Sequence, residues 1–498
     1  MKILIRSSML YIFIASILLT ASAQNRNMIW MLDSKFSDNL SQGLDFSNGS
    51  LVMFTEDGRS EFYLSNASIC DTNGQLLFYS NGNLIKNRNF DSLDNTFGFN
   101  PGYATDEYPD GLPIPQGAIV IPKPNKPEQY FLFHESADEI FPLTGYDAQP
   151  LELRYSLIDI TLDNSMGGIV VGSKTKPIII DTLTLGRLNA CKHANGRDWW
   201  LVCHEYYTNK YYKLLITPDT ILGPFQQYIG TPILYDIFGY AVFTPDGNWY
   251  ANLSPEQSVD LMKFDRCTGE FSNQIHLEIP DSSLLLSCMF SPNNRFLYVA
   301  SYIHIFQYDL LANDIPNSVI TVATYDYDSQ PGLARWFTLM QLAPDNKIYI
   351  STYNSTAFLH IIDDPDSLGL NCKVIQSGVS LLSYNNASIP NYPNYDLGPL
   401  QGSPCDTLFS STAQHQTNAI SFRISPNPSS DWINIVYETD YEIVATISDA
   451  FGRELKSFSL YPWFRNRIVH VDDLPDGVYL LTLNSQSWKQ TMKLIVAN

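Results

Sequence analysis

The densest group of side chains able to do chemistry lies between residues 193 and 205. The candidates are two histidines, two carboxylates and a tryptophan: His193, Asp198, Trp199, His204 and Glu205. A histidine beside a carboxylate can accept and donate protons, and an indole offers a flat surface to a sugar ring. A structural interpretation competes, in which Trp199 and Trp200 alternate between core and surface while the polar groups hydrogen-bond within the fold. We therefore predict a candidate binding site here and no catalytic residue.

Complete catalytic motifs are absent from the sequence. There is no Gly-x-Ser-x-Gly, and the His-Glu pairs that begin at His134 and His204 lack the second histidine of a zinc protease. The segment 167–175 imitates a phosphate-binding loop, but Ser173 separates its glycine from the lysine and no helix is expected to follow. These absences favour a protein that is not an enzyme and holds no metal.

Two turns, 106–111 and 363–366, are rich in carboxylates. Carboxylate oxygens bind Ca²⁺, but neither turn has the ligand spacing of an EF-hand loop, so solvated turn residues are favoured and no cofactor is predicted. Scattered carboxylates on loops keep a rival hypothesis open. In that hypothesis the protein is a hydrolase of polysaccharide or peptide, whose two carboxyl groups must lie roughly 5 to 10 Å apart.

A repeated strand, turn and strand must position these residues. The segment 243–250 recurs as 290–298 and as 342–349, each with Pro followed by Asp or Asn in a tight turn. Taking the turn residues as markers, the repeat is about fifty residues long; the markers are Asn73, Asn125, Asn195, Asp246, Asn293 and Asp345. Helical periodicity is missing between them, so four short strands per repeat are expected. That arithmetic is typical of the blades of a β-propeller.

The two ends of the repeat region supply unassigned strands. These are 29–32, 51–54, 379–384 and 387–392. We expect them to pair as one further blade that closes the ring and removes exposed sheet edges. The prediction is an all-β, seven-bladed β-propeller over residues 24–405, with six blades as the alternative.

The charge balance limits the partners. The chain of 498 residues has 30 basic and 51 acidic side chains, a formal net charge of −21. An acidic surface repels phosphate backbones, so nucleic acid is not expected as a partner.

The N-terminus has the form of a secretory signal peptide, residues 1–23. Lys2 and Arg6 precede an apolar run, and small residues lead to a cleavage site between Ala23 and Gln24. The run is too short for a confident membrane span, and no later run reaches ~18 apolar residues, so no transmembrane anchor is expected. We predict a protein that is secreted or displayed on the outer-membrane surface.

Seven cysteines in an exported chain allow at most three disulfides. Cys191 and Cys203 flank a turn almost symmetrically, which suggests a bridge across a hairpin. The remaining neighbours in order are Cys267 with Cys288 and Cys372 with Cys405, which leaves Cys70 as a buried thiol. Spacing alone does not establish these pairings.

The last part of the chain forms a second module. Residues 406–423 are rich in Ser, Thr, Gln and Asn and are interpreted as a linker. Five short β-rich segments separated by turn residues follow within 424–498. This pattern predicts a small immunoglobulin-like β-sandwich.

The landmarks of this module resemble the type A sorting domain of the Bacteroidetes type IX secretion system. They are Pro426, Asn427, Pro428, Gly452, Arg453, Gly477, Tyr479 and Lys493. The resemblance implies passage through the outer-membrane translocon that recognises this domain. It also implies removal of the domain by a sortase-like peptidase, after which the cargo is released or attached to surface lipopolysaccharide.

The propeller region is similar, less specifically, to surface and gliding-associated proteins of the same bacteria. The segments that carry this similarity are 43–46, 76–82, 193–200 and 264–269. The leading hypothesis is a non-enzymatic propeller that binds a protein or glycan through loops on one face of the ring. The alternatives are the hydrolase above and a structural adhesin or surface-coat component.

Overall fold

The computed structural model describes two compact units, divided after Asp406. The described residues are 25–33, 40–57, 61–138, 148–236, 238–256, 258–327, 333–406, 422–437, 439, 442–449, 453–484 and 489–497. The expected signal peptide, its cleavage site at Ala23 and Gln24, most of the expected linker, and Gly452 lie outside these residues.

The larger unit contains seven antiparallel sheets in chain order over its described residues. The first has β1 (Ile29–Leu32), β2 (Leu40–Asp45) and β3 (Val52–Asp57); the second has β4 (Ala67–Cys70), β5 (Leu76–Ser80) and β6 (Ile85–Asn87). The third has β7 (Ala118–Pro122), β8 (Gln129–Glu135) and β9 (Glu152–Asp159), with β10 (Gly168–Ile169) and β11 (Lys176–Ile180) both paired to β9.

The next four sheets each have four strands. The fourth has β12 (Asn189–Lys192), β13 (Trp199–His204), β14 (Lys210–Ile216) and β15 (Ile221–Tyr228); the fifth has β16 (Tyr240–Phe243), β17 (Trp249–Ser254), β18 (Ser258–Phe264) and β19 (Phe271–Glu278). The sixth has β20 (Leu285–Phe290), β21 (Phe296–Ser301), β22 (His304–Asp309) and β23 (Ile320–Thr324); the seventh has β24 (Phe337–Leu342), β25 (Ile348–Thr352), β26 (Thr356–Ile362) and β27 (Val374–Asn385). The described helices are short: α1 (Tyr103–Glu107), α2 (Leu162–Ser165), η1 (Pro316–Ser318) and η2 (Gly369–Cys372). The prediction of an all-β fold is confirmed.

The turn chemistry expected from the sequence joins the first two strands of the second to seventh sheets. In the fifth sheet, Asp246 Oδ1 accepts hydrogen bonds from the Thr244 hydroxyl (2.6 Å) and the Asn248 amide (3.0 Å). Gly247 has φ +74°, a conformation that side chains disfavour. All six turn markers predicted from the sequence occupy this position in their sheets.

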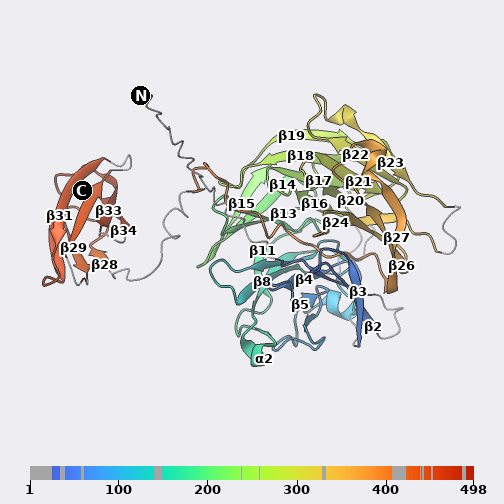
Figure 1. Ribbon diagram of the computed structural model, residues 1–498, viewed down its shortest axis with the longest axis horizontal. Helices are drawn as coiled ribbons and strands as arrows, with labels where there is room; N and C mark the ends of the chain where they lie inside the picture. The colour runs from blue at the N-terminus through green and yellow to red at the C-terminus, as the bar shows by residue number, and fades with distance from the viewer. Residues whose placement is uncertain are drawn as a thin grey trace, which may run out of the picture. The chain divides into compact units, whose positions relative to one another are not determined.

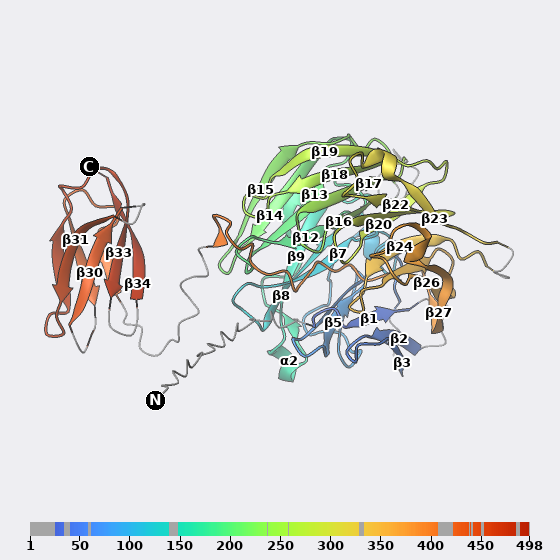
Figure 2. The same ribbon diagram turned by 45° about the horizontal axis from the view of Figure 1, so that its top comes forward.

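The sheets follow one another round a ring, in a propeller-like arrangement (Figures 1 and 2). In the fifth to seventh sheets, β16, β20 and β24 lie towards the middle, whereas β19, β23 and β27 lie at the periphery (Figure 1). One hydrophobic core takes buried side chains from every sheet, among them Trp30, Phe78, Ile119, Leu201, Leu253, Tyr298 and Ile350. We call the face where the first strands of the second to seventh sheets begin the start face, and the face of the marker turns the hairpin face.

The first and seventh sheets meet directly. The Gln42 side-chain amide donates to Ser383 O (2.8 Å) and accepts from Ser383 N (3.0 Å), and the Trp30 ring lies 5.7 Å from that of Tyr349. The prediction that 379–384 joins a blade shared by both termini is wrong, since these residues belong to β27 and pair with β26. A hairpin with the adjacent strand closes a much shorter loop than a pairing between the termini, and so costs less entropy.

The segment 387–397, which we call the axial segment, runs from the start face to the hairpin face. It begins where Asn386 N donates to Asp33 O (3.4 Å), and its Tyr392 hydroxyl donates to Ile29 O (2.9 Å) at the other end of β1. It therefore passes beside β1, but no strand ladder is formed there, in contrast to the strand expected at 387–392.

Asn391 anchors the axial segment to several sheets at once. Its side-chain amide donates to Ala118 O (3.1 Å) and Leu188 O (2.9 Å), which belong to or precede the first strands of two sheets. Its Oδ1 accepts from Gln116 (3.3 Å), and its backbone N donates to Asn66 O (2.9 Å). These contacts place the segment on the inner side of the ring, where the first strands converge.

The C-terminal unit is a sandwich of two antiparallel sheets. One has β28 (Phe422–Ser425), β29 (Trp432–Tyr437) and β32 (Asn466–His470); the other has β30 (Ile443–Ser448), β31 (Glu454–Leu460), β33 (Gly477–Asn484) and β34 (Lys489–Val496). Alternate residues of both sheets, such as Ile433, Ile435, Leu481 and Leu483, form its separate hydrophobic core.

Candidate functional site

A cavity of about 510 Å³ lies on the start face of the larger unit. Its lining comes from segments that precede first strands, from the turn between β25 and β26, and from the end of β27: Tyr63, Leu64, Phe238, Leu333, Tyr353, Asn354, Ser355, Tyr384, Asn386 and Ala387. These segments meet because antiparallel register sets the start of β24 beside the end of β25, and the start of β26 beside the end of β27. The volume is within the range of small-molecule sites.

Tyrosine side chains form the accessible part of this cavity. Tyr63, Tyr353 and Tyr384 are 38%, 40% and 46% exposed, so each presents ring surface to solvent. The ring of Tyr353 packs against Tyr302 (5.6 Å between centroids) and Trp336 (6.1 Å), which holds it in place from behind. Burial raises the pKa of Tyr63 above its usual value, so its phenol is neutral at physiological pH.

Among the residues that the structure describes, neither a carboxylate nor a basic side chain lines the cavity. Its polar groups are amides and hydroxyls, and the Asn354 amide is already oriented by donation to Ala334 O (2.7 Å). Aromatic faces flanked by neutral hydrogen-bonding groups suit an uncharged ligand with both apolar and hydroxyl surface. Sequence reasoning missed this cavity, although the aromatic residues before first strands and in the β25–β26 turn were a usable signal.

The polar cluster predicted at 193–205 is divided by a strand. His193 and Asp198 lie in the β12–β13 turn on the hairpin face, whereas His204 ends β13 and Glu205 follows it towards the start face. A six-residue strand spans roughly 20 Å, so the two groups do not form one site. Trp199 begins β13 and is 2% exposed, which leaves little ring surface for a sugar. A binding role for any of these five residues stays a prediction.

The hairpin-face residues of this cluster hold the turn together. His193 Nδ1 accepts from Asn195 N (3.1 Å), so its Nε2 is the nitrogen that donates to Cys267 O (3.0 Å). Asp198 accepts from Arg197 Nε (2.7 Å) and Nη2 (2.9 Å) and from Asn195 Nδ2 (2.9 Å). These contacts account for the polar side chains as structural groups.

The start-face residues of the cluster are also engaged in the fold. His204 is buried against the Tyr211 ring (4.6 Å between centroids), and burial lowers its pKa to about 3. Its imidazole therefore stays neutral and out of contact with solvent. Glu205 forms an ion pair with Lys210.

A buried charge cluster, which the sequence did not reveal, joins the third to fifth sheets. Arg187 Nη1 and Asp236 Oδ1 form a fully buried ion pair (2.9 Å), and the same guanidinium donates through Nε (3.2 Å) and Nη2 (2.9 Å) to Leu253 O. Glu135 Oε2 accepts from Gly186 N (3.2 Å), and burial raises the pKa of this carboxyl far above its usual value. Arg187 and Asp236 are 49 residues apart, so no local pattern connected them.

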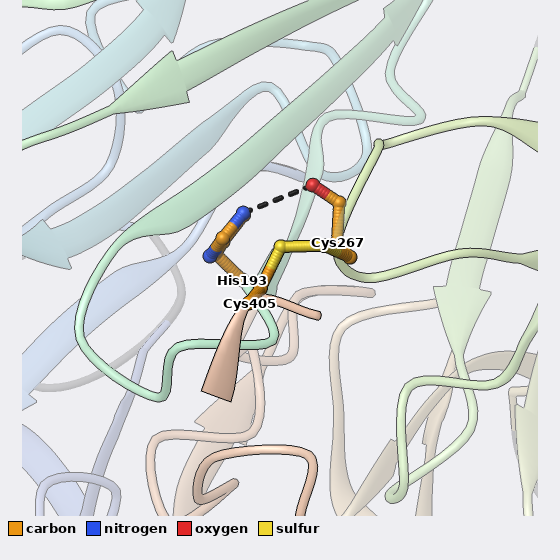
Figure 3. Close-up of side chains that lie close together, drawn as sticks. All are labelled: His193, Cys267 and Cys405. Atoms are coloured by element: carbon orange, nitrogen blue, oxygen red, sulfur yellow. Dashed lines mark hydrogen bonds between the residues drawn. A yellow bond between two sulfur atoms is a disulfide. The ribbon is translucent and has the colours of Figure 1, made fainter. Parts of the chain in front are cut away.

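The disulfide lies between Cys267 and Cys405, with the His193 imidazole beside it (Figure 3). The three predicted pairings are therefore wrong: Cys191 with Cys203, Cys267 with Cys288, and Cys372 with Cys405. Cys70, Cys191, Cys203, Cys288 and Cys372 are free and buried, which confirms the prediction for Cys70.

The β12–β13 register explains the first error. Cys191 lies opposite Trp200, so Cys203 is three residues further along and points to the other face of the sheet. The path of the chain after the axial segment explains the bridge at Cys405, because Leu400 N donates to Ala194 O (2.8 Å) and carries this segment across the hairpin face.

The carboxylate-rich turn 363–366 makes protein contacts. Asp363 pairs with Lys347 Nζ (2.6 Å), Asp364 accepts from the Ser367 hydroxyl (3.1 Å), and Asp366 accepts from Asn293 N (2.9 Å). The other turn, 106–111, begins at the end of the short helix α1. That neither turn holds a calcium ion stays a prediction.

The sorting-signal residues have structural roles in the C-terminal unit. The Asn427 side chain donates to Lys493 O (2.8 Å) and accepts from Ile495 N (2.8 Å), so the turn between Pro426 and Pro428 is fixed to β34. The Tyr479 hydroxyl donates to Pro475 O (2.6 Å). Two further landmarks act locally, since Gly477 begins β33 and Arg453 contacts Asp449 through its backbone N (2.9 Å) and its Nε (3.2 Å).

Residues 423–497 match the family of secretion system C-terminal sorting domains. The C-terminal unit is therefore a type IX sorting domain, as its motifs predicted, and it directs export to the cell surface or the medium through interaction with the secretion machinery. Among the described residues, no helix is long and apolar enough to span a membrane.

The solved structures similar to this chain are distant. A protein of unknown function from Desulfotomaculum acetoxidans is 11% identical, with 73% of this chain and 99% of that chain covered and a TM-score of 0.38. A dihydro-heme d1 dehydrogenase is 10% identical, with 91% and 76% covered and a TM-score of 0.38. No curated protein shows a significant match to the chain.

Proposed function

We propose that this exported protein is a seven-bladed β-propeller that binds an uncharged glycan in the start-face cavity and carries a removable, immunoglobulin-like type IX sorting domain. Each of the seven sheets would be one blade, with the axial segment in the innermost position of the first. The signal peptide 1–23 would direct passage across the inner membrane of a Bacteroidetes cell. A sortase-like peptidase would then remove the sorting domain.

The observation that carries the binding role is the cavity of partly exposed tyrosines with no ionised lining group. A sugar ring has apolar faces that stack on aromatic rings and hydroxyls that pair with amides such as Asn354. Charged polymers gain nothing from such a lining, since no opposite charge is present to offset their desolvation.

The same lining argues against the hydrolase hypothesis at this cavity. Glycoside hydrolysis uses two carboxyl groups on either side of the scissile bond, and none of the described lining residues carries one. Glu135 has the raised pKa of a general acid but is completely buried, so it does not meet a substrate in this structure.

Calorimetric titration of the mature chain with uncharged oligosaccharides of glucose, xylose and mannose tests the proposal. Tyr353→Ala and Tyr384→Ala should each weaken binding about tenfold or more, because each removes a stacking face. Tyr228→Ala is the matched control, since Tyr228 is 65% exposed on the outer strand β15 and does not line the cavity. If the protein binds no oligosaccharide but binds a protein partner, and Tyr353→Ala weakens that binding, then the ligand of the cavity is a protein and not a glycan. Equal affinity of all variants would refute the site.

The export role has its own test. The full chain and a version lacking residues 424–498 are expressed in a Bacteroidetes host, followed by fractionation and mass spectrometry of the mature ends. We expect only the full chain to reach the surface or medium, with Gln24 as its first residue and the sorting domain removed. Equal delivery of both forms would contradict the proposal.

A further inference from the structure

A second cavity, of about 240 Å³, lies on the hairpin face between the third and fourth sheets. Of the described residues that line it, five are basic and none is a carboxylate; the basic ones are Arg26, Lys123, Lys126, Lys192 and Arg197. The chain as a whole has 51 acidic and 30 basic residues. A cavity whose charged lining residues are all basic therefore differs from the average composition of the chain.

Two marker turns bring these side chains together. The β7–β8 turn carries Lys123 and Lys126 between prolines, with Asn125 at φ +57°. The β12–β13 turn carries Arg197, and Lys192 is the last residue of β12. The prolines restrict the backbone φ angles of the first turn. Holding its two lysines near the second turn therefore costs less conformational entropy.

Lys192 is the best-defined group of the cavity. It is 5% exposed and lies opposite Trp199 in the β12–β13 register. Its Nζ is 5.2 Å from the centre of the Trp199 ring. Among the described residues, no hydrogen-bond acceptor or ion-pair partner contacts this ammonium, although it has three protons to donate. Burial lowers the pKa of Lys192 to about 8, with Arg26 and Arg266 adding to the effect and Asp396 opposing it.

Two of the other basic groups are engaged in the fold. Arg197 is paired with Asp198, and Arg26 Nη1 donates a hydrogen bond to the Tyr130 hydroxyl (2.9 Å). Asp396 acts on Lys192 electrostatically but does not line the cavity. An ammonium on a largely buried side chain is costly to leave without an acceptor, and an anion that accepted hydrogen bonds from it would reduce that cost.

We propose that this basic cavity binds a ligand through a single phosphate, sulfate or carboxylate group. Lys192 would donate to the anion from the floor of the cavity, and Lys123 and Lys126 from its rim. The volume suits one charged group or a sugar that bears one, and it is small for a larger ligand. The chain has a formal net charge of −21, which disfavours a densely charged anionic polymer, so an isolated oxyanion is the expected chemistry.

Isothermal titration of the protein without its signal peptide, at low ionic strength, tests the site. The probes are inorganic phosphate, glucose 6-phosphate, glucose and heparin. The first two should bind and glucose should not, and the affinity should fall at 0.3 M NaCl as screening increases. If only glucose 6-phosphate binds, the ligand is a sugar that carries the anion; if both bind, the free anion suffices.

Lys192→Met keeps the packing of the side-chain stem on Trp199 and removes the charge. We expect it to weaken phosphate binding about tenfold or more. Lys263→Met is the control for losing a lysine that stacks on a tryptophan, because Lys263 stands opposite Trp249 with its Nζ 5.3 Å from the ring centre, and it is exposed and outside the cavity. If Lys192→Met fails to fold, the double variant Lys123→Gln with Lys126→Gln tests the site instead, because both of its residues lie on a turn.

Several outcomes would overturn this site. They are the absence of binding to either phosphate probe, binding of heparin alone, and unchanged affinity in both the Lys192 variant and the turn variant. The start-face tyrosine variants should bind phosphate normally, so failure of this inference and failure of the proposed glycan site are separate results.

Discussion

Replacing Asn391 by alanine tests whether the axial segment holds the ring together. The side chain is 3% exposed and donates two hydrogen bonds, to Ala118 O (3.1 Å) and Leu188 O (2.9 Å). It also accepts a longer one from Gln116 Nε2 (3.3 Å). The substitution removes all three and leaves a small cavity between the sheets.

The cost can be worked from these contacts. Each buried hydrogen bond contributes about 1 kcal/mol net, and a buried carbonyl left without its donor costs about 1 to 3 kcal/mol. The Gln116 amide keeps its second acceptor, Ala241 O (2.9 Å), so its loss is small. The free energy of unfolding of the larger unit should therefore fall by about 3 kcal/mol in Asn391→Ala.

The matched control is Asn394→Ala, in the same segment. Asn394 is exposed; its side chain donates to Pro245 O (2.7 Å) and accepts from Asp396 N (3.0 Å). Exposed hydrogen bonds exchange with water, so its replacement should cost no more than about 1 kcal/mol. Both free energies of unfolding are measured by urea unfolding of the full-length variants. Tryptophan fluorescence and limited proteolysis monitor the transition. If the two variants unfold at the same urea concentration, Asn391 does not anchor the segment and the reasoning fails.

Three further predictions concern stability. Breaking the disulfide by replacing Cys267 and Cys405 with serine frees a loop of 138 residues in the unfolded chain, so stability should fall by up to about 5 kcal/mol, and a reducing agent should have no effect on the variant. His204→Phe should reduce the loss of stability on acidification, measured as the pH slope of the unfolding free energy between pH 6 and 4. The pKa of His204 is about 3 in the folded protein and about 6.5 in the unfolded chain, so below pH 6.5 protons bind the unfolded chain preferentially. The folded state therefore loses about 1.4 kcal/mol of stability per pH unit. An unchanged slope in His204→Phe would contradict this. Gly239→Ala should destabilise the fold by several kcal/mol, because the new Cβ would lie 2.1 Å from a buried guanidinium nitrogen, whereas Gly398→Ala has nothing within 4 Å and should unfold like the parent protein.

Local chemistry made much of this protein predictable from its sequence. The marker turns around Asp246 and Asn293 and the strands on either side of them lie where the sequence placed them, because turns and hairpins depend on residues within a few positions. The sorting domain was recognisable for the same reason, since Asn427 and Tyr479 act within short motifs that hold turns against neighbouring strands.

The candidate sites depended on contacts that no local pattern encodes. Tyr63 and Tyr384 meet at one cavity, Lys192 meets Lys123 at another, and Cys267 bonds to Cys405 rather than to its neighbour in sequence. Each contact joins segments that are far apart in the sequence. By itself, the sequence therefore determined the strands, the turns and the sorting domain, while the tertiary structure decided which side chains share a site, because closure of the ring and the path of the axial segment set the distances between residues far apart in the chain.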